Sequence, residues 1–201
     1  MKMEQLYRIL ISVGLSVRFE KDNLKEISSL NGYSYQLMRR DSKWVYSEID
    51  YKSKPDLKII ESMEFATEEE GVKYYLFNRL QSFYLHKYKS ISSIGEKITS
   101  FADFEKKMKE LGIEEDNYSF SVIKPQSFLG LMEDSLMRIN YVNRHNKICF
   151  SSSPFAFDRG SSILFTNVYL LHLLKNLERN LMNEQVLVQP FTDEYIETFI
   201  K

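Results

Sequence analysis

A cysteine and a histidine close together in the sequence are the residues of this chain with the most evident catalytic potential. Cys149 follows His145 by four positions, and a thiolate beside an imidazole is the nucleophile of many enzymes. The segments 136–142 and 147–152 predict a hairpin whose turn holds His145, whereas Cys149 lies within the returning strand. Because the two side chains need not meet in this arrangement, we interpret Cys149 as a buried apolar thiol.

The other residue types that support catalysis or metal binding do not occur in productive spacings. The three histidines, His86, His145 and His172, are too far apart in the sequence for two of them to share one face of an element. There is no glycine-rich phosphate loop and no Gly-x-Ser-x-Gly turn. The consecutive glutamates 68–70 are explained by a helix start. The sequence therefore predicts no catalytic residue, no metal site and no cofactor.

The composition predicts an ordered protein that does not bind nucleic acid along its whole surface. Aromatic residues make up 14% of the chain against only 7 glycines and 4 prolines, which favours a ring-rich core over disorder. The 27 basic and 28 acidic side chains are mixed along the chain, so no positive excess attracts phosphate groups. One cysteine cannot form an internal disulfide, and the longest apolar segment, 168–174, is too short to cross a bilayer. We expect a cytoplasmic protein without membrane association.

Capping and turn signals define the elements of the first half. An apolar stripe interrupted by Glu4 and Arg8 predicts a helix that stops at Gly14, and not a signal peptide. Thr67 and Glu70 form a capping box at the start of a second helix. The elements expected here are a helix over 3–12, a hairpin of strands over 33–40 and 43–50, a strand over 57–65 and a helix over 68–89.

Similar signals define the second half. Ser100 and Asp103 predict a cap for a helix that ends at Gly112, and Thr192 caps a last amphipathic helix. The other elements expected here are a strand over 118–123, the hairpin of 136–142 and 147–152, a long helix over 166–182 and a strand over 186–189.

These elements predict the fold class and the domain organisation. We expect an α+β fold in which antiparallel hairpins pack with amphipathic helices, in a single compact domain over 1–201. Three features recur at offsets of 98, 99 and 97 residues: the helix stops Gly14 and Gly112, the Leu-Met-Arg triplets at 37–39 and 136–138, and the long helices around Leu80 and Leu177. This spacing suggests an internal duplication of 1–97 and 98–201.

Two segments offer candidate binding residues. The hairpin from Arg39 to Lys58 combines basic residues with Trp44 and Tyr46, a mixture that suits single-stranded nucleic acid, although a solvated sheet face gives the same alternation. The segment 151–160 is the most irregular of the chain, and serves either as a plug under the core or as a recognition loop. Its candidate partner contacts are Phe155, Phe157, Asp158 and Arg159.

One stretch resembles a known family. The run Gly32-Tyr33-Ser34-Tyr35 leads a hairpin with Trp44 on its return strand, and 65–72, Phe-Ala-Thr-Glu-Glu-Glu-Gly-Val, passes from strand into helix. Over about residues 30–85 this is similar to the small immunity proteins of bacterial polymorphic toxin systems. The resemblance implies a protein that binds and blocks its cognate toxin without doing chemistry, and it assigns no functional residue.

Three function classes follow from the sequence. The first is a non-enzymatic module that binds a protein partner, a cognate toxin domain, with Trp44, Tyr46, Phe155 and Arg159 among its anchors. The second is a nucleic-acid-binding or regulatory protein of a mobile element that uses the basic hairpin. The third is an enzyme of an unrecognised type built on carboxylates or tyrosines.

Overall fold

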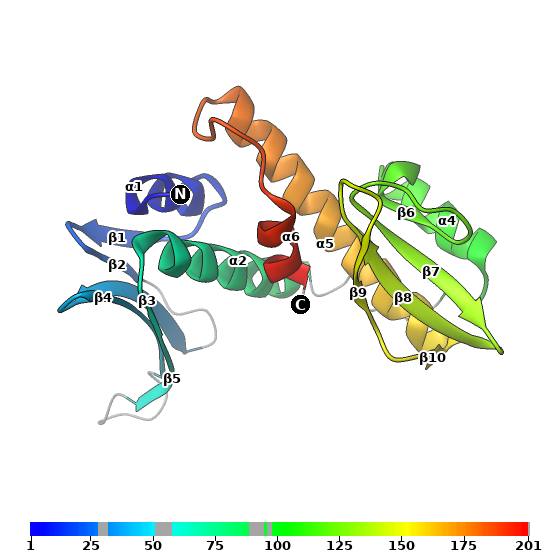
Figure 1. Cartoon of the computed structure of the whole chain (residues 1–201), viewed down its shortest axis with the longest axis horizontal. Helices are drawn as coiled ribbons and strands as arrows, with labels where there is room; N and C mark the ends of the chain where they lie inside the picture. Colours follow the sequence, from blue (N-terminus) through cyan, green and yellow to red (C-terminus); the bar gives the residue numbers. More distant parts are fainter. Residues whose placement is uncertain (28–31, 51–57, 89–94, 96–97, 201) are drawn as a thin grey trace. The chain divides into compact units, whose positions relative to one another are not determined.

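A computed structural model describes residues 1–27, 32–50, 58–88, 95 and 98–200 of the chain (Figure 1). It has an α+β fold whose residues form two compact units. The first unit contains residues 1–79 and 181–189, and the second contains 80–180 and 190–201. No helix among the described residues is both long and apolar enough to cross a membrane.

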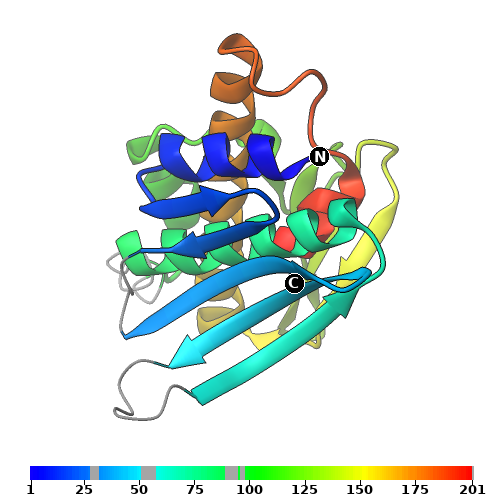
Figure 2. The ribbon, with the colours of Figure 1, turned by 90° about the vertical axis from the view of Figure 1, so that its left-hand side faces the viewer.

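The first unit is built on a five-stranded antiparallel sheet whose strands follow one another in chain order. Figure 2 shows β3, β4 and β5 as long, twisted neighbours. Residue Asp41, at the turn between β3 and β4, has φ 56°, the left-handed conformation that tight hairpins require. The strands are β1 (Val17–Glu20), β2 (Asn23–Glu26), β3 (Tyr33–Arg40), β4 (Lys43–Asp50) and β5 (Lys58–Phe65).

Helix α2 (Glu68–Lys87) packs its first turns closely on this sheet. Its capping box is formed: Thr67 N donates to Glu70 at 3.0 Å, and Glu70 N donates to the Thr67 hydroxyl at 3.3 Å. A Cβ at Gly71 would lie 3.1 Å from Leu37 and 3.2 Å from Trp44. The glycine therefore allows the helix to approach β3 and β4 more closely than another residue would.

Helix α1 (Met3–Ser12) completes the first unit by packing an apolar stripe inward. Its buried residues are Met3, Leu6, Ile9 and Leu10. The helix stops at Gly14, which has φ 92°. Glu68 accepts hydrogen bonds from Met3 N at 2.9 Å and from Lys2 Nζ at 3.0 Å, so the first turn of α2 holds the first turn of α1.

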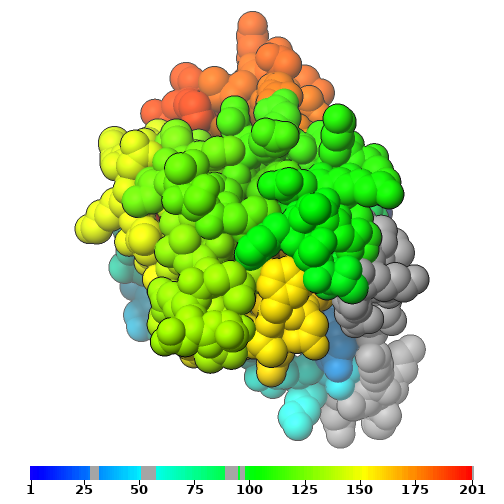
Figure 3. All heavy atoms as spheres, turned by 90° about the vertical axis from the view of Figure 1, so that its right-hand side faces the viewer, coloured from blue at the N-terminus to red at the C-terminus, as the bar shows by residue number. Residues whose placement is uncertain are grey.

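The second unit is built on a mixed sheet. Its strands lie in the order β10-β8-β7-β6, β9 pairs with β8, and β6 runs parallel to β7. Figure 3 shows one face of this unit, where the bright green atoms of α4 lie beside the yellow-green atoms of the following strands. The strands are β6 (Tyr118–Ser119), β7 (Ser127–Glu133), β8 (Leu136–Val142), β9 (Ile148–Ser151) and β10 (Phe155–Ala156).

Three helices and a 3-10 turn complete the second unit around an aromatic core. The ring of Phe104 makes edge contacts with Tyr118, Phe120 and Phe165 at centroid distances of 5.2, 5.2 and 5.8 Å. The predicted cap is present, since Asp103 N donates to the Ser100 hydroxyl at 3.1 Å. The elements are α4 (Phe101–Glu110), η1 (Glu115–Asn117), α5 (Phe157–Asn183) and α6 (Asp193–Ile200).

Several predicted elements are confirmed and four details are wrong. The helix over 3–12 and the hairpin of 33–40 and 43–50 occur as predicted. The strand over 118–123 is limited to its first two residues, and residues 186–189, predicted as a strand, are an irregular segment after the turn that ends α5. The helix predicted over 166–182 begins nine residues earlier, at Phe157. Strands β1, β2, β7 and β10 were not predicted.

The internal duplication stays a prediction. Each half contains a helix, five strands and a long helix in the same chain order. However, the triplet 37–39 ends the first arm of its hairpin, whereas 136–138 begins the second arm. The sheets also differ, because β6 pairs in parallel with β7 while β1 to β5 are all antiparallel.

Candidate functional site

The first unit contains a fully buried ion pair. Arg79 donates from Nε and Nη2 to Glu26 Oε1, at 2.8 and 2.7 Å. Both side chains are only 1% exposed. Glu26 lies at the end of β2, and Arg79 lies on the face of α2 that packs on the sheet. Because the pair is shielded from solvent, removal of either partner leaves the other buried without a counter-charge and destabilises the fold.

Tyrosines surround this ion pair. The guanidinium carbon of Arg79 lies 3.7 Å from the ring centroid of Tyr35. The hydroxyl of Tyr75 donates to the carbonyl oxygen of Tyr35 at 3.2 Å, and the Ser34 hydroxyl donates to the carbonyl oxygen of Glu26 at 3.2 Å. These bonds fix β2, β3 and α2 relative to one another within the unit.

A row of half-buried tyrosines and glutamates lies next to the ion pair. The hydroxyl of Tyr35 donates to Glu48 at 3.4 Å, and that of Tyr74 donates to Glu61 at 2.8 Å. Glu48 on β4 is the cross-strand partner of Glu61 on β5. We call Tyr35, Glu48, Glu61 and Tyr74 the tyrosine–glutamate row.

The row brings two carboxylates together on adjacent strands. Within the described residues, neither Glu48 nor Glu61 forms an ion pair. Like charges directly opposite one another on a sheet destabilise it. Burial and the bond to Glu61 raise the pKa of Tyr74 to about 12, and burial also raises the pKa of Tyr35 to about 12. Both tyrosines therefore remain hydrogen-bond donors at neutral pH.

The arrangement is suited to holding a cation. Two carboxylates on adjacent strands, each oriented by a tyrosine hydroxyl, provide charge in a fixed geometry. Comparisons with family models, curated proteins and solved structures find no match to this chain. A function for it must therefore rest on what its own side chains can bind. Among the described residues, no three His, Cys, Asp or Glu side chains gather as metal ligands would.

The structure places Trp44 and Tyr46 in the core. Trp44 is 7% exposed and packs beside Gly71, and Tyr46 is fully buried. The ring of Tyr46 makes an edge contact with Tyr74 at 5.0 Å and a tilted contact with Tyr35 at 6.3 Å. Neither ring is presented to solvent as a partner contact. Tyr46 instead packs against the two tyrosines of the tyrosine–glutamate row.

The structure brings the other four predicted contacts together in the second unit. The interpretation of 151–160 as one irregular loop is wrong, because Phe155 belongs to β10 and Phe157 begins α5. Arg159 lies 5.1 Å from the ring centroid of Phe155, and Phe157 packs edge-on against Phe101 at 5.3 Å. Asp158 and Arg159 are exposed on the first turn of α5. Partner binding by these residues stays a prediction.

Cys149 and His145 lie in different parts of the hairpin. Cys149 lies on β9 and its thiol donates to the carbonyl oxygen of Lys147 at 3.6 Å, while His145 lies in the preceding turn. The thiol is partly exposed rather than buried as predicted. Burial and the neighbouring Glu197 carboxylate raise its pKa, which lowers the thiolate fraction that a nucleophile needs.

The ion pair and the row were not among the residues that the sequence singled out. The sequence contains a signal that Arg79 is buried. Arg79 follows Val72 by seven positions and so lies on the apolar face of α2, which also contains Tyr75 and Leu76. A charged residue on an apolar stripe indicates a buried partner. The identity of that partner, Glu26, depends on the fold.

Proposed function

We propose that this chain is a non-enzymatic protein-binding module whose tyrosine–glutamate row holds a basic surface of another protein. The supporting observation is that Glu48 and Glu61 lie opposite each other without an ion-pair partner among the described residues. A lysine or arginine of a partner would relieve their repulsion. Tyrosines beside them supply rigid contact area of the kind that dominates interface energies.

The geometry favours a protein partner over a nucleic acid. Phosphate groups are repelled by the two carboxylates of the row. The rings of Trp44 and Tyr46 are buried, so they are not available for stacking on bases. On the hairpin, Lys43 also pairs with Glu64, which reduces its attraction for phosphates.

The proposed class is an immunity protein that neutralises a cognate bacterial toxin. The proposal combines the resemblance over residues 30–85 with the position of the row, because all four row residues lie within that range. An immunity protein acts by binding, so it needs a preformed complementary surface rather than an active site. The buried pair of Arg79 and Glu26 gives the row a rigid base.

The test begins with the tagged chain purified from its native host, treated with nuclease, and analysed by mass spectrometry for a stoichiometric partner. That partner is then produced separately and titrated with the wild-type chain and with Glu48→Gln and Glu61→Gln. We expect each variant to lose about tenfold or more in affinity, because a close interfacial charge pair is worth roughly 1.5 kcal/mol or more. Co-expression should also abolish the toxicity of the partner.

A matched control is Glu4→Gln. Glu4 is an exposed glutamate of α1 in the same unit and lies outside the row. Its affinity for the partner should equal that of the wild type. A partner that binds the two row variants as tightly as the wild type, or recovery of nucleic acid alone, would refute the proposal.

A further inference from the structure

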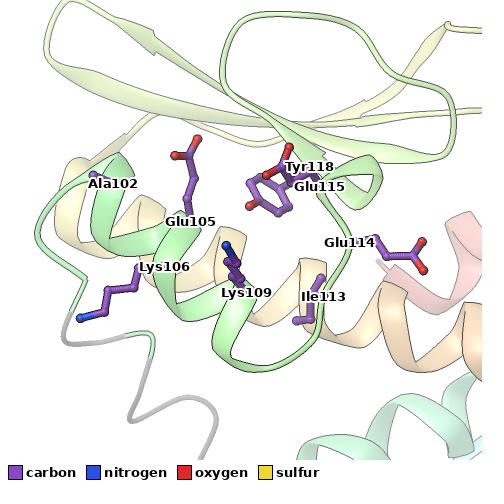
Figure 4. Close-up of a pocket in the computed structure, with 8 residues that line it drawn as sticks. All are labelled: Ala102, Glu105, Lys106, Lys109, Ile113, Glu114, Glu115 and Tyr118. Carbon is purple, nitrogen blue, oxygen red and sulfur yellow. The ribbon is translucent and has the colours of Figure 1, made fainter.

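A groove in the second unit lies between α4 and the segment that leads through η1 into β6. It consists of two adjoining hollows, of about 430 and 370 Å³, that share Glu105, Glu115 and Tyr118. Figure 4 shows these three residues on the walls of the first hollow, with Lys106 and Glu114 directed away from it. The second hollow continues along 119–122.

Tyr118 is held rigidly at the point where the two hollows meet. The residue is only 4% exposed, and its ring packs against Phe104 and Phe120 at 5.2 and 5.9 Å. Its hydroxyl makes no hydrogen bond within the described part of the chain, although the residue lines both hollows. The ring is therefore fixed by packing, while the hydroxyl at the hollows is available to a ligand.

Two glutamates line the hollows together with this hydroxyl. Glu105 projects from α4 and Glu115 from η1, and neither forms an ion pair among the described residues. Burial and these two carboxylates raise the pKa of Tyr118 to about 12. The hydroxyl stays protonated and neutral at physiological pH.

Two of the lysines around the groove are engaged elsewhere, and a third is directed toward it. Lys106 lies 4.0 Å from Glu110 on the same helix, and Lys124 donates to the backbone carbonyl oxygen of Glu115 at 2.7 Å. Lys109 points from α4 toward the first hollow in Figure 4, and it forms no ion pair within the described residues. It is the internal cation that competes most directly with a ligand.

We propose that this groove binds the guanidinium or ammonium group of an arginine or lysine side chain carried by an extended peptide segment. The cation lies between Glu105 and Glu115 and donates a hydrogen bond to the Tyr118 hydroxyl. The peptide backbone continues along the second hollow, where Ser119 accepts hydrogen bonds from Ser121 N and Val122 N and so fixes the wall. Val122, which is 54% exposed, offers an apolar contact for the next residue.

The test is a titration of the full chain with the peptide acetyl-Ala-Ala-Arg-Ala-Ala-amide, followed by isothermal calorimetry and by NMR of the Tyr118 ring. Substitution of citrulline for arginine keeps the shape and removes the charge. We expect roughly tenfold weaker binding of the citrulline peptide, since a charge-assisted bond is about twice as strong as a neutral one. Equal binding of the two peptides would overturn the proposal.

Substitutions in the groove test whether the peptide binds there. Glu105→Gln and Glu115→Gln should each weaken binding several-fold, and Tyr118→Phe should weaken it while leaving the ring packing intact. Asp134→Asn is the matched control, because Asp134 is an exposed acidic residue between β7 and β8 that lines neither hollow. Lys109→Met should strengthen binding by removing the competing cation. Weaker binding by Lys109→Met would indicate an anion site and would overturn the proposal.

A last experiment compares the affinity of the peptide with that of a single arginine derivative. Acetyl-arginine methylamide carries the same guanidinium without the extended chain, and it should bind more weakly than the peptide. Equal affinity would refute the part of the proposal that concerns the extended segment. The groove and the tyrosine–glutamate row lie in different units, so the variants of one site test it independently of the other.

Discussion

Arg79 directs two hydrogen bonds to a single oxygen of Glu26 and leaves the other oxygen of that carboxylate, Oε2, buried without a partner among the described residues. Burial raises the pKa of Glu26, while the charge and hydrogen bonds of Arg79 oppose this rise. The two residues are separated by 53 positions in the sequence. This pair therefore ties the end of β2 to the middle of α2 through charge as well as through packing.

Replacement of the arginine should be severely destabilising. Arg79→Met leaves the Glu26 carboxyl buried without its cation, and we expect a loss of about 3–5 kcal/mol in the free energy of unfolding. The double variant Glu26→Leu/Arg79→Met removes both charges and should recover most of that loss. Urea denaturation followed by circular dichroism measures both. Equal stability of the single and double variants would show that the two charges are not coupled.

The bond between Glu68 and the start of α1 should make stability depend on pH. Burial tends to raise the pKa of Glu68, but the hydrogen bonds from Met3 N and Lys2 Nζ and the charges of Lys2 and the N-terminus outweigh it and lower the pKa. A lowered pKa contributes stability that is present above the ordinary value near 4.5 and is lost as the pH falls through the folded-state value. The difference in stability between wild type and Glu68→Gln should thus be larger at neutral pH than in acid.

Urea titration of the wild type and of Glu68→Gln, from neutral to acid pH, measures how the difference in unfolding free energy changes with pH. Glu70→Gln is not a suitable control because Glu70 belongs to the capping box. Glu4→Gln is the matched control for removing a carboxylate near the start of α1. A difference between wild type and Glu68→Gln that grows toward acid pH would contradict the assignment.

The close approach of α2 to the sheet predicts the effect of a single methyl group. In a helix, Gly→Ala ordinarily stabilises by about 1 kcal/mol. At Gly71 the added Cβ would lie 3.1 Å from Leu37 and 3.2 Å from Trp44, and overpacking of this kind costs roughly 1–3 kcal/mol. We expect Gly71→Ala to lower the melting temperature. An increase would mean that α2 can move away from β3 and β4 at no cost.

The C-terminal helix of the second unit should depend on Arg144. This side chain pairs with Asp193 at 3.2 Å and donates to the carbonyl oxygen of Phe191 at 2.7 Å. Because Arg144 is partly exposed, we expect Arg144→Met to change global stability by no more than about 1 kcal/mol. Amide hydrogen exchange over 191–200 should nevertheless become faster, since local opening costs less than global unfolding. Lys147→Met, in the same turn, provides the control.

The elements that the sequence determined are those with local signals. The capping box at Thr67 and the N-cap at Ser100 mark helix starts through bonds between residues three positions apart, and Asp41 marks a hairpin turn. The apolar stripe of α1 likewise repeats every three or four residues. Interactions of this range are readable in one sequence, and together they indicate an α+β fold.

Strand β7 and the early start of α5 were decided by tertiary structure. Gly130 interrupts the pattern of β7, yet a Cβ there would lie 2.8 Å from Leu164 of α5, and a Cβ at Gly160 would lie 2.8 Å from Met137 of β8. Glycines that signal a loop in the sequence are thus sites where a helix and the sheet approach each other closely within the second unit.

The binding candidates were decided in the same way. The sequence named Trp44 and Tyr46 from their residue types, and the fold buried both of them. The pairing of Glu48 with Glu61 arises from strand register, and helix packing brings Tyr118, Glu105 and Glu115 to one groove. Such juxtapositions have no period or spacing in the sequence, because they join residues whose distance is set by the whole chain. Local hydrogen bonding therefore determined the elements of this protein, and long-range packing determined its sites.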